Sequence, residues 1–350
     1  MTLPVISQIQ GRVGRLTLNR PAALHALTQE MCQLMVDALQ AWRRSPQVRT
    51  IMIDHAGERG FCAGGDIRMV AQSGAGDGAA AADFFRVEYQ LNDLLFAYEK
   101  PIIAVMDGVT MGGGCGLALP ARVRVATERT LLAMPEARIG LFPDVGGGWH
   151  LPRLPDEIGT WLALTGARLR AADCREAGLA THFIPSDRLD PFKQALMHED
   201  GGLDELLDRF GADPGPSDLT QRRPQIRAAF SGSTVEQILQ GLERDGSDWA
   251  QAQLREISIN SPTTLKVALR QLHAGARMNA FAEVMRMEFR IASRITALHD
   301  FSVGVEAALN RRGEPPQWMP ASLDQVSDVM LDALFQPLPD DREWRPLPTP

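Results

Sequence analysis

The sequence is poor in the features that mark several classes of protein. Its 350 residues include only four cysteines, and no two of them have metal-ligand spacing or form a CxxC pair: Cys32, Cys62, Cys115 and Cys174. We therefore expect reduced thiols that pack as small core residues, and no metal site. No apolar run reaches the roughly 18 residues that a transmembrane helix needs, so we expect no membrane partner.

The chain also has no excess of basic residues. It contains 36 Lys and Arg against 43 Asp and Glu, which gives a formal net charge of −7. A general nucleic-acid binder carries a basic face, so we expect no nucleic-acid partner. The first ten residues, MTLPVISQIQ, have neither the basic nor the apolar region of a secretory signal, and we therefore expect a cytoplasmic protein.

Up to about residue 200, short strands alternate with helices. Alternating and apolar runs predict a β-hairpin and three further strands, at Val5–Ile9, Val13–Leu18, Ile51–Ile53, Pro101–Val105 and Val123–Val125. We expect a helix after an N-cap at Thr28 and another from about Phe84 to Tyr98. The small residues of AQSGAGDGAAAA (71–82) suggest a mobile loop or a frayed helix start between them. This order is typical of an α/β fold.

Beyond about residue 200, helical periodicity replaces the alternation. It is clear in TVEQILQGLERD (234–245) and FAEVMRMEFRIASRITAL (281–298), and we expect no strand in this part. We therefore divide the chain into an α/β core, residues 1–200, and a helical C-terminal region, residues 201–350.

Three of the turns that follow expected strands are rich in glycine. They contain Gly64-Gly65, Gly112-Gly113-Gly114 and Gly146-Gly147-Gly148. Glycine lets the backbone approach a ligand closely, and the N–H groups at the start of a helix face outward. Two such turns brought together could donate hydrogen bonds to a developing oxyanion. Each could equally be no more than a tight turn.

Two acids stand in the apolar segment MPEARIGLFPDVGGG (134–148), and each follows a proline. Pro143 argues against one continuous helix through Glu136 and Asp144. The apolar neighbours would desolvate the acids and raise at least one pKa, which suits a general base near neutral pH. From residue type alone, Glu136 could instead start a helix and Asp144 could cap one.

Taken in order, FCAGGDI (61–67), MDGVTMGGGCGLAL (106–119) and MPEARIGLFPDVGGG resemble the crotonase (enoyl-CoA hydratase/isomerase) superfamily, along the whole chain. The combination of MPE with PDVGGG, supported by VRVATE (123–128) and SPTTLK (261–266), is similar to its 3-hydroxyisobutyryl-CoA hydrolase branch. The resemblance implies a crotonase-like ββα-spiral core with a helical C-terminal region. It also implies a homo-oligomer that acts on an acyl-CoA, with coenzyme A as part of the substrate and no further cofactor.

The resemblance assigns roles to particular residues. The backbone N–H groups of Gly65 and Gly113 are the implied oxyanion donors, and Ala63 and Gly64 are implied substrate contacts. Glu136 is the acid that attacks the thioester, either as nucleophile or as the base that activates water. Asp144 takes the substrate's 3-hydroxyl group and orients Glu136 or the water.

Glu88 is a third acid of interest. Its segment, FFRVEYQLN (84–92), resembles one in which the hydrolase branch has a substrate-contacting glutamate. The alternative is an exposed helical acid that forms an ion pair with Arg86 or Lys100.

Three basic positions depart from the family pattern or remain open. His25 stands where the superfamily usually has asparagine, and we expect it to pack or cap, not to catalyse. The family's lysine for the CoA phosphates is replaced in this region by Arg311 and Arg312, either of which could meet a phosphate.

The implied activity is hydrolysis of a short 3-hydroxyacyl-CoA thioester, 3-hydroxyisobutyryl-CoA or 3-hydroxypropionyl-CoA, in valine catabolism. Hydratases of the superfamily have a glutamate just past the GGG motif, and here Gly116 occupies that position. Half of the hydration pair is therefore missing. A hydratase or isomerase of the same fold and a non-catalytic CoA-binding protein remain the alternatives.

Overall fold

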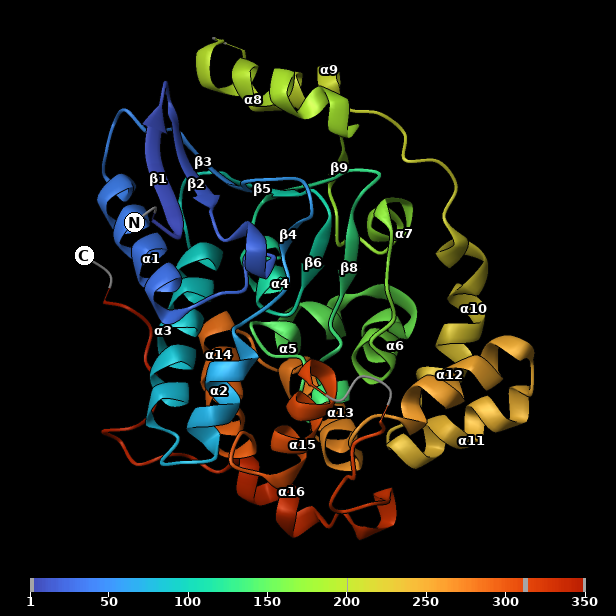
Figure 1. Cartoon of the computed structure of the whole chain (residues 1–350). Coiled ribbons are helices and arrows are strands. Elements are labelled where there is room, and N and C mark those ends of the chain that lie inside the picture. The colour runs from blue at the N-terminus through green and yellow to red at the C-terminus, as the bar shows by residue number, and fades with distance from the viewer. Residues whose placement is uncertain (1–2, 200, 311–313, 349–350) are drawn as a thin grey trace. The chain divides into compact units, whose positions relative to one another are not determined.

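The computed structural model describes residues 3–199, 201–310 and 314–348 (Figure 1). They form two units, each made of segments that are distant in the sequence. The first unit comprises Met1–Gly65, Gln90–Ala133 and Arg168–Thr220, and the second comprises Asp66–Tyr89, Met134–Ala167 and Gln221–Pro350. The predicted division at residue 200 stays a prediction.

A six-stranded sheet forms the centre of the first unit. Its strand order is β1-β2-β3-β5-β7-β9, and only the β1–β2 pair is antiparallel. The strands are β1 (Val5–Gln10), β2 (Val13–Leu18), β3 (Thr50–His55), β5 (Ile102–Met106), β7 (Val123–Ala126) and β9 (His182–Phe183). The predicted hairpin and the three further predicted strands are therefore confirmed, and the structure shows that these three pair in parallel. Strands β3 and β5 are buried almost throughout, as expected for a parallel sheet that is covered on both faces.

The helices of the first unit close over this sheet. Thr28 caps α1 (Gln29–Arg43) by accepting a hydrogen bond from the Met31 N–H, as predicted. Phe192 of α8 (Leu189–His198) and Leu206 of α9 (Leu203–Phe210) join the same apolar cluster as residues of β5 and β7. The unit also contains α7 (Ala171–Glu176) and the short α4 (Gly113–Ala118).

A second, three-stranded parallel sheet in the same unit positions the glycine turns. It consists of β4 (Gly60–Cys62), β6 (Val109–Met111) and β8 (Leu131–Ala133). Along the chain, a strand of the large sheet is followed three times by a strand of the small sheet and then by a helix: β3-β4-α2, β5-β6-α4 and β7-β8-η2. This repeated order is the ββα arrangement that the resemblance to the crotonase superfamily implies.

The second unit is helical. Among the described residues of this unit no strand occurs. Its helices are α2 (Ile67–Gly74), most of α3 (Ala79–Phe96), η2 (Glu136–Ile139), α5 (Gly147–His150), η3 (Leu151–Arg153), η4 (Pro155–Glu157), α6 (Ile158–Thr165), α11 (Val235–Asp245), α12 (Asp248–Ser258), α13 (Pro262–Gly275), α14 (Phe281–Ile295), α15 (His299–Leu309), η6 (Leu323–Gln325) and α16 (Asp328–Phe335). Helix α10 (Asp218–Phe230) begins at the end of the first unit and continues into the second. The helical character predicted for the C-terminal part is confirmed.

Of the two alternatives for residues 71–82, the mobile loop is wrong for most of the segment, whereas a helix start is observed, because α2 extends to Gly74 and α3 begins at Ala79. Small residues permit close packing there: a β-carbon on Gly74 would lie 2.2 Å from the Thr296 carbonyl oxygen. The Ser73 hydroxyl also accepts a hydrogen bond from the Ala81 N–H at 2.9 Å and so links the two helices.

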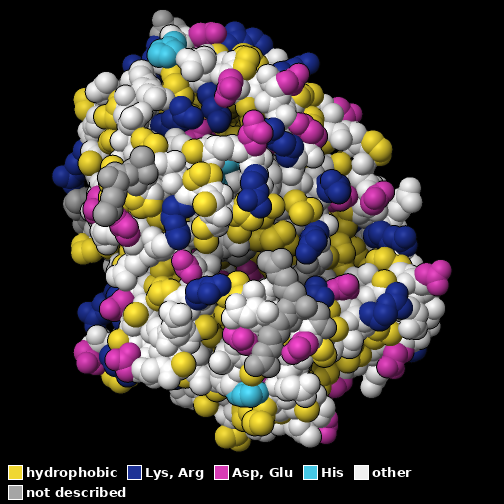
Figure 2. All heavy atoms as spheres, in the orientation of Figure 1, with side chains coloured by type: hydrophobic (Ala, Val, Ile, Leu, Met, Phe, Trp, Pro, Cys, Tyr) yellow, Lys and Arg dark blue, Asp and Glu magenta, His cyan; other side chains and the backbone are white. Residues whose placement is uncertain are grey.

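The surface is mixed in charge. On the face drawn in Figure 2, basic and acidic side chains are interspersed among apolar and neutral ones. None of the helices that the structure describes combines the length and the apolarity of a membrane span.

Candidate active site

Three buried carboxyl groups of the second unit form the candidate site. Glu136 is the first residue of η2, Asp144 lies in the loop before α5, and Glu88 lies in α3. They are 5%, 4% and 2% exposed, respectively. Gly140, with φ 73°, ends η2, so no helix runs from Glu136 to Asp144, as the prolines predicted. We call these three residues the acid cluster.

Asp144 is the member of the acid cluster with a strong hydrogen-bond donor. The Tyr89 hydroxyl donates to Asp144 Oδ2 at 2.7 Å, and Tyr89 is itself fully buried. Burial raises the pKa of Asp144 to about 6, although the Tyr89 hydrogen bond opposes the shift. The alternative role of Asp144 as a helix cap is not observed, because the N-cap of α5 is Gly146 and no side chain caps that helix.

The ionised forms of Glu136 and Glu88 are stabilised even less than that of Asp144. Burial, followed by the charge of Asp144, raises both pKa values well above the usual range, and Glu136 adds to the effect on Glu88. Glu136 Oε2 and Glu88 Oε1 are buried and have no hydrogen-bond partner in the described part of the chain. Since like charges in a dry site oppose one another, the three groups cannot all ionise near neutral pH.

The alternative interpretation of Glu88 as an exposed, ion-paired acid is wrong. Arg86 donates to the backbone carbonyls of Arg342 and Glu343, and its guanidinium lies 4.7 Å from the centre of the Phe289 ring. Lys100 donates to the backbone carbonyls of Trp42 and Ser45. Glu88 therefore faces the other acids and not a cation.

A fourth buried acid holds the loop that carries Asp144. Glu288 of α14 is fully buried and accepts hydrogen bonds from the N–H groups of Gly146 and Gly148, both at 2.8 Å. The Gln271 Nε2 amide of α13 donates both to Glu288 Oε1 at 2.9 Å and to the Pro143 carbonyl at 2.7 Å. We call Glu288 and Gln271 together the loop clamp. Burial and the charge of Asp144 raise the pKa of Glu288 to about 8 against these three N–H donors.

The clamped loop has a strained backbone. Val145 has a φ of 50°, in the left-handed region that β-branched residues rarely adopt. Such a conformation costs on the order of 1–3 kcal/mol and persists only where the surroundings enforce it. The neighbouring Gly146, with φ 91°, adopts the same region at little cost.

Sequence reasoning missed Tyr89 and the loop clamp, although one signal was present. Glu288 interrupts the apolar face of α14, where Val284, Met285, Ile291 and Ala292 are all buried. An acid at i, with apolar residues at i−4, i−3, i+3 and i+4, is enclosed by the core and needs buried partners.

The predicted oxyanion turns lie in the first unit, and they are adjacent to each other within it. A β-carbon on Gly64, whose φ is 113°, would lie 3.7 Å from the nitrogen of Gly113. Gly113 is the first residue of α4, so its N–H has no carbonyl partner within that helix. Gly65 forms a parallel bridge with Leu27, in which the Leu27 N–H donates to the Gly64 carbonyl, so the N–H of Gly65 faces away from Leu27.

The neighbouring backbone groups are already hydrogen-bonded. The Ala63 N–H donates to the Leu24 carbonyl at 3.0 Å, and the Gly64 carbonyl accepts from the Leu27 N–H at 2.8 Å. Ala63 is exposed. Gly116 lies inside α4, where its carbonyl accepts from the Asn92 side chain at 3.0 Å, and it presents no carboxylate.

The basic positions divide into two groups. His25 is 2% exposed, its Nδ1 accepts from the Arg20 backbone N–H at 3.0 Å, and burial lowers its pKa. It is a packing and capping residue, as predicted. Arg311 and Arg312 lie outside the described residues. In the part of the chain that the structure describes, no three His, Cys, Asp or Glu side chains are grouped to hold a metal ion.

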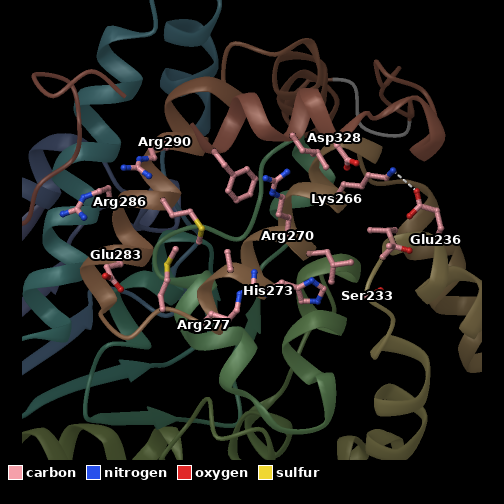
Figure 3. A pocket seen from close by; sticks show the side chains of 18 of the residues that line it. Ser233, Glu236, Lys266, Arg270, His273, Arg277, Glu283, Arg286, Arg290 and Asp328 are labelled. Carbon is pink, nitrogen blue, oxygen red and sulfur yellow. Dashed lines mark ion pairs between the residues drawn. The ribbon is translucent and has the colours of Figure 1, made fainter. Parts of the chain in front are cut away.

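A separate cavity of about 880 Å³ lies within the second unit (Figure 3). None of the acid cluster lines it, and two of its four arginines form ion pairs. Lys266 extends towards Glu236 and pairs with it at 2.8 Å, while Arg270 and Arg290 pair with Asp332 and Glu343. With Asp332 and Glu343 included, the five lining Lys and Arg are balanced by five acids: Glu236, Glu283, Asp328, Asp332 and Glu343. Ion pairs therefore compensate part of the positive charge of this lining.

Curated relatives match nearly the whole chain. A protein of Xenopus laevis named "3-hydroxyisobutyryl-CoA hydrolase, mitochondrial" is 43% identical over 94% of this chain and 87% of its own length. The Homo sapiens protein of the same name is 40% identical over 95% of this chain and 89% of its own length. The cytoplasmic location predicted from the sequence is contradicted, because these relatives are named as mitochondrial. That prediction depended on the absence of a secretory signal, and such an absence does not distinguish one compartment inside the cell from another.

Solved structures share the fold along the whole length. The crystal structure of a carnitinyl-CoA dehydratase from Mycobacterium thermoresistibile matches with a TM-score of 0.94 and 37% identity, covering 98% of this chain and 99% of that one. An enoyl-CoA hydratase from Rhodobacter sphaeroides 2.4.1 matches with a TM-score of 0.90 and 36% identity over the same shares. The family model described as enoyl-CoA hydratase/isomerase matches residues 13–335. The chain therefore belongs to the enoyl-CoA hydratase/isomerase (crotonase) family and, within it, to the 3-hydroxyisobutyryl-CoA hydrolase branch.

Proposed function

We propose that this enzyme hydrolyses a short 3-hydroxyacyl-CoA thioester, 3-hydroxyisobutyryl-CoA or 3-hydroxypropionyl-CoA, to the free acid and CoA. The observation that carries the proposal is the buried acid cluster, in which Asp144 has the Tyr89 donor and Glu136 has an unpartnered oxygen. Curated relatives named as 3-hydroxyisobutyryl-CoA hydrolases, at about 40% identity, support the same substrate.

Glu136 carries out the attack in this proposal. As a base, its carboxylate takes a proton from water, and the hydroxide adds to the thioester carbon. As a nucleophile, it adds to that carbon itself and forms an anhydride that water then hydrolyses. In both routes the carbon–sulfur bond breaks and CoA leaves as a thiolate, which takes its proton from Glu136 in the base route and from water in the anhydride route. Single turnover in H₂¹⁸O separates the routes, because only the anhydride route places ¹⁸O in the Glu136 carboxyl group.

The developing oxyanion accepts hydrogen bonds from the backbone N–H groups of Gly65 and Gly113. Their freedom from partners in the local secondary structure supports this role. Donors aimed at the oxyanion in a site that excludes water contribute about 3–4 kcal/mol each to the transition state. Ala63 and Gly64 contact the substrate beside them, Ala63 through its carbonyl because its N–H is already bonded.

Asp144 accepts the 3-hydroxyl group of the substrate, and Glu88 completes the acyl pocket. Asp144 suits this role because it is the acid with the least raised pKa in the cluster, and an ionised carboxylate is a strong acceptor for a hydroxyl. The raised pKa values of Glu88 and Glu136 favour their protonated forms in the empty site. We further propose that the enzyme acts in valine catabolism as a homo-oligomer without a separate cofactor.

Hydration of an enoyl-CoA is the second candidate, because solved relatives carry hydratase and dehydratase names. That reaction needs two acids to hold one water against the β-carbon, and Gly116 has no side chain with which to supply the first. An acyl-CoA panel assayed for thiol release, with crotonyl-CoA hydration followed in parallel, decides between them. We expect release from the 3-hydroxyacyl esters and no competent hydration. Rapid hydration without thiol release would show that the enzyme is a hydratase.

A further inference from the structure

The loop clamp lies where it can control the position of Asp144. Its hydrogen bonds reach the Pro143 carbonyl on one side of Asp144 and the N–H groups of Gly146 and Gly148 on the other. Asp144 itself makes none of these bonds. The backbone around Asp144 is thus held from both sides, while its carboxylate is left to Tyr89 and a substrate.

Burial of the Glu288 carboxyl group costs free energy, which indicates that the loop clamp has a role beyond packing. An apolar residue at position 288 would suit the buried face of α14, whereas a buried carboxyl must recover its lost hydration through hydrogen bonds. No ion pair of the described residues involves Glu288, so all its support comes from three N–H donors. Two of these donors are the backbone N–H groups of Gly146 and Gly148 in the Asp144 loop. The third is the side chain of Gln271, which also donates to the Pro143 carbonyl.

The Asp144 loop packs closely against the side chains of the loop clamp. A β-carbon on Gly148 would lie 3.0 Å from both Glu288 Oε1 and Gln271 Nε2, and one on Gly275 would lie 1.9 Å from the Gly148 carbonyl oxygen. The unfavourable φ of Val145 lies between the clamped residues. A loop with this strain would relax if the clamp were removed, and Asp144 would move with it.

We propose that Glu288 is a positioning residue for the reaction: through Gly146, Gly148 and Gln271 it places the Asp144 carboxylate against the 3-hydroxyl group of the substrate. The inference rests on the proposed function for its kinetic consequence. Its structural part, that Glu288 determines where Asp144 lies, does not depend on that function.

The kinetic test uses substrate selectivity. In Glu288→Gln, an NH₂ group replaces one of the two carboxylate oxygens that accept hydrogen bonds. At least one of the hydrogen bonds from Gly146, Gly148 and Gln271 is therefore lost. We expect kcat/KM for 3-hydroxyisobutyryl-CoA, relative to that for isobutyryl-CoA, to fall about tenfold or more, since a displacement of about 1 Å can cost that much. In an Asp144→Asn background, Glu288→Gln should change this ratio no further, because the two residues act through one contact.

The structural test uses the two tyrosines of the chain. Protein labelled with ¹³C at the tyrosine Cζ gives one signal each from Tyr89 and Tyr98, and a Tyr98→Phe variant identifies that of Tyr89. Because Tyr89 donates to Asp144, its signal should shift in Glu288→Gln. The matched control is Ile291→Ala on the same buried face of α14, which should lower the melting temperature but leave both the signal and the ratio unchanged.

The two parts can fail separately. If the wild-type enzyme hydrolyses no acyl-CoA, the proposed function fails, while the Tyr89 signal still decides the positioning role. A folded Glu288→Gln protein with an unchanged Tyr89 signal and an unchanged ratio would overturn the inference. If that variant does not fold, Gln271→Leu removes the bond to Pro143 at similar volume and should shift both readouts the same way. The absence of both shifts there would equally overturn it.

Discussion

At the scale of single residues, the acid cluster is organised by an unequal distribution of charge. Asp144, with the Tyr89 donor and a pKa of about 6, is largely ionised at neutral pH. Burial, followed by the charge of Asp144, raises the pKa of Glu136 and of Glu88 well above the usual range and so favours their neutral forms. Since Glu136 must lose its proton before it can attack, the hydrolysis rate should rise as the pH rises.

Glu136→Gln should keep the fold, because the neutral amide resembles the protonated acid that the empty site favours. Thioester hydrolysis should fall by about 100-fold or more, on the order of 3 kcal/mol, because the base or nucleophile is lost. Thiol release under saturating substrate measures the effect, and isothermal titration with free CoA serves as the control for binding. Turnover close to that of the wild type would remove Glu136 from the mechanism.

Asp144→Asn should act on selectivity more than on basic turnover. The amide is a poorer acceptor for the 3-hydroxyl group, and a site built around a hydroxyl discriminates strongly against a mismatch. We expect kcat/KM for 3-hydroxyisobutyryl-CoA to fall about 100-fold and that for isobutyryl-CoA to change far less. Equal losses on the two esters would mean that Asp144 serves the attack itself and not the hydroxyl.

The sequence was informative at these residues because their local context is unusual. Proline before each acid, apolar neighbours and a following run of glycines all lie within fifteen letters, and they indicated Glu136 and Asp144 correctly as buried acids. Tyr89 and Glu288 could not be paired with them in this way. Their contacts with Asp144 and its loop span 55 and more than 140 positions in the chain, and only the tertiary fold brings such residues together.

At the scale of elements, helix α4 shows how neighbouring glycines can serve different ends. Gly113 begins the helix with an N–H that no carbonyl of the helix accepts, whereas a β-carbon on Gly114 would lie 2.4 Å from the Cys62 carbonyl oxygen of β4. The first glycine is suited to a ligand and the second to the contact between α4 and β4. The short strands β4, β6 and β8 were not predicted, because three residues are too few to show the alternation that marks a strand.

Gly113→Val should therefore abolish hydrolysis with little change in melting temperature, because the new side chain blocks the thioester oxygen from the N–H. Gly114→Ala is the matched variant and should lower the melting temperature, since the Cys62 backbone has to move. Calorimetry and thiol release on both proteins make the comparison. A strongly destabilised Gly113→Val would show that this glycine is needed for the backbone and not for the substrate.

At the scale of the whole molecule, most of the described carboxyl groups with raised pKa values lie in the second unit, and Asp93 of the first unit is the exception. Glu88, Glu136, Asp144 and Glu288 all bind their protons more tightly in the folded than in the unfolded chain. In the first unit, ion pairs hold the pKa of Asp54 and Asp107 below the usual range. This difference in pKa shifts between the units could not be predicted from the sequence, because each unit is assembled from segments that are distant in the chain.

The second unit should therefore lose stability as pH rises. An acid with a raised folded-state pKa stabilises the fold fully below its unfolded pKa and loses that contribution as pH rises through the folded pKa. The window here runs from about pH 4 to about pH 8, and each tenfold gain in proton affinity on folding corresponds to about 1.4 kcal/mol. Calorimetry at pH 5.5 and pH 8 should give a lower melting temperature at pH 8. A higher one would mean that the acids are ionised in the fold without cost.

The four buried cysteines all belong to the first unit, whereas five of the six tryptophans belong to the second. Burial keeps these thiols from colorimetric disulfide reagents, so the native enzyme should be silent in an assay that detects the thiol of released CoA. During denaturation, the reaction of these cysteines with the reagent reports the unfolding of the first unit. Tryptophan fluorescence mainly reports the unfolding of the second unit. Coincident curves would mean that the molecule melts as one cooperative body. Separate curves at alkaline pH, with tryptophan fluorescence changing first, would mean that the second unit unfolds while the first unit is still folded.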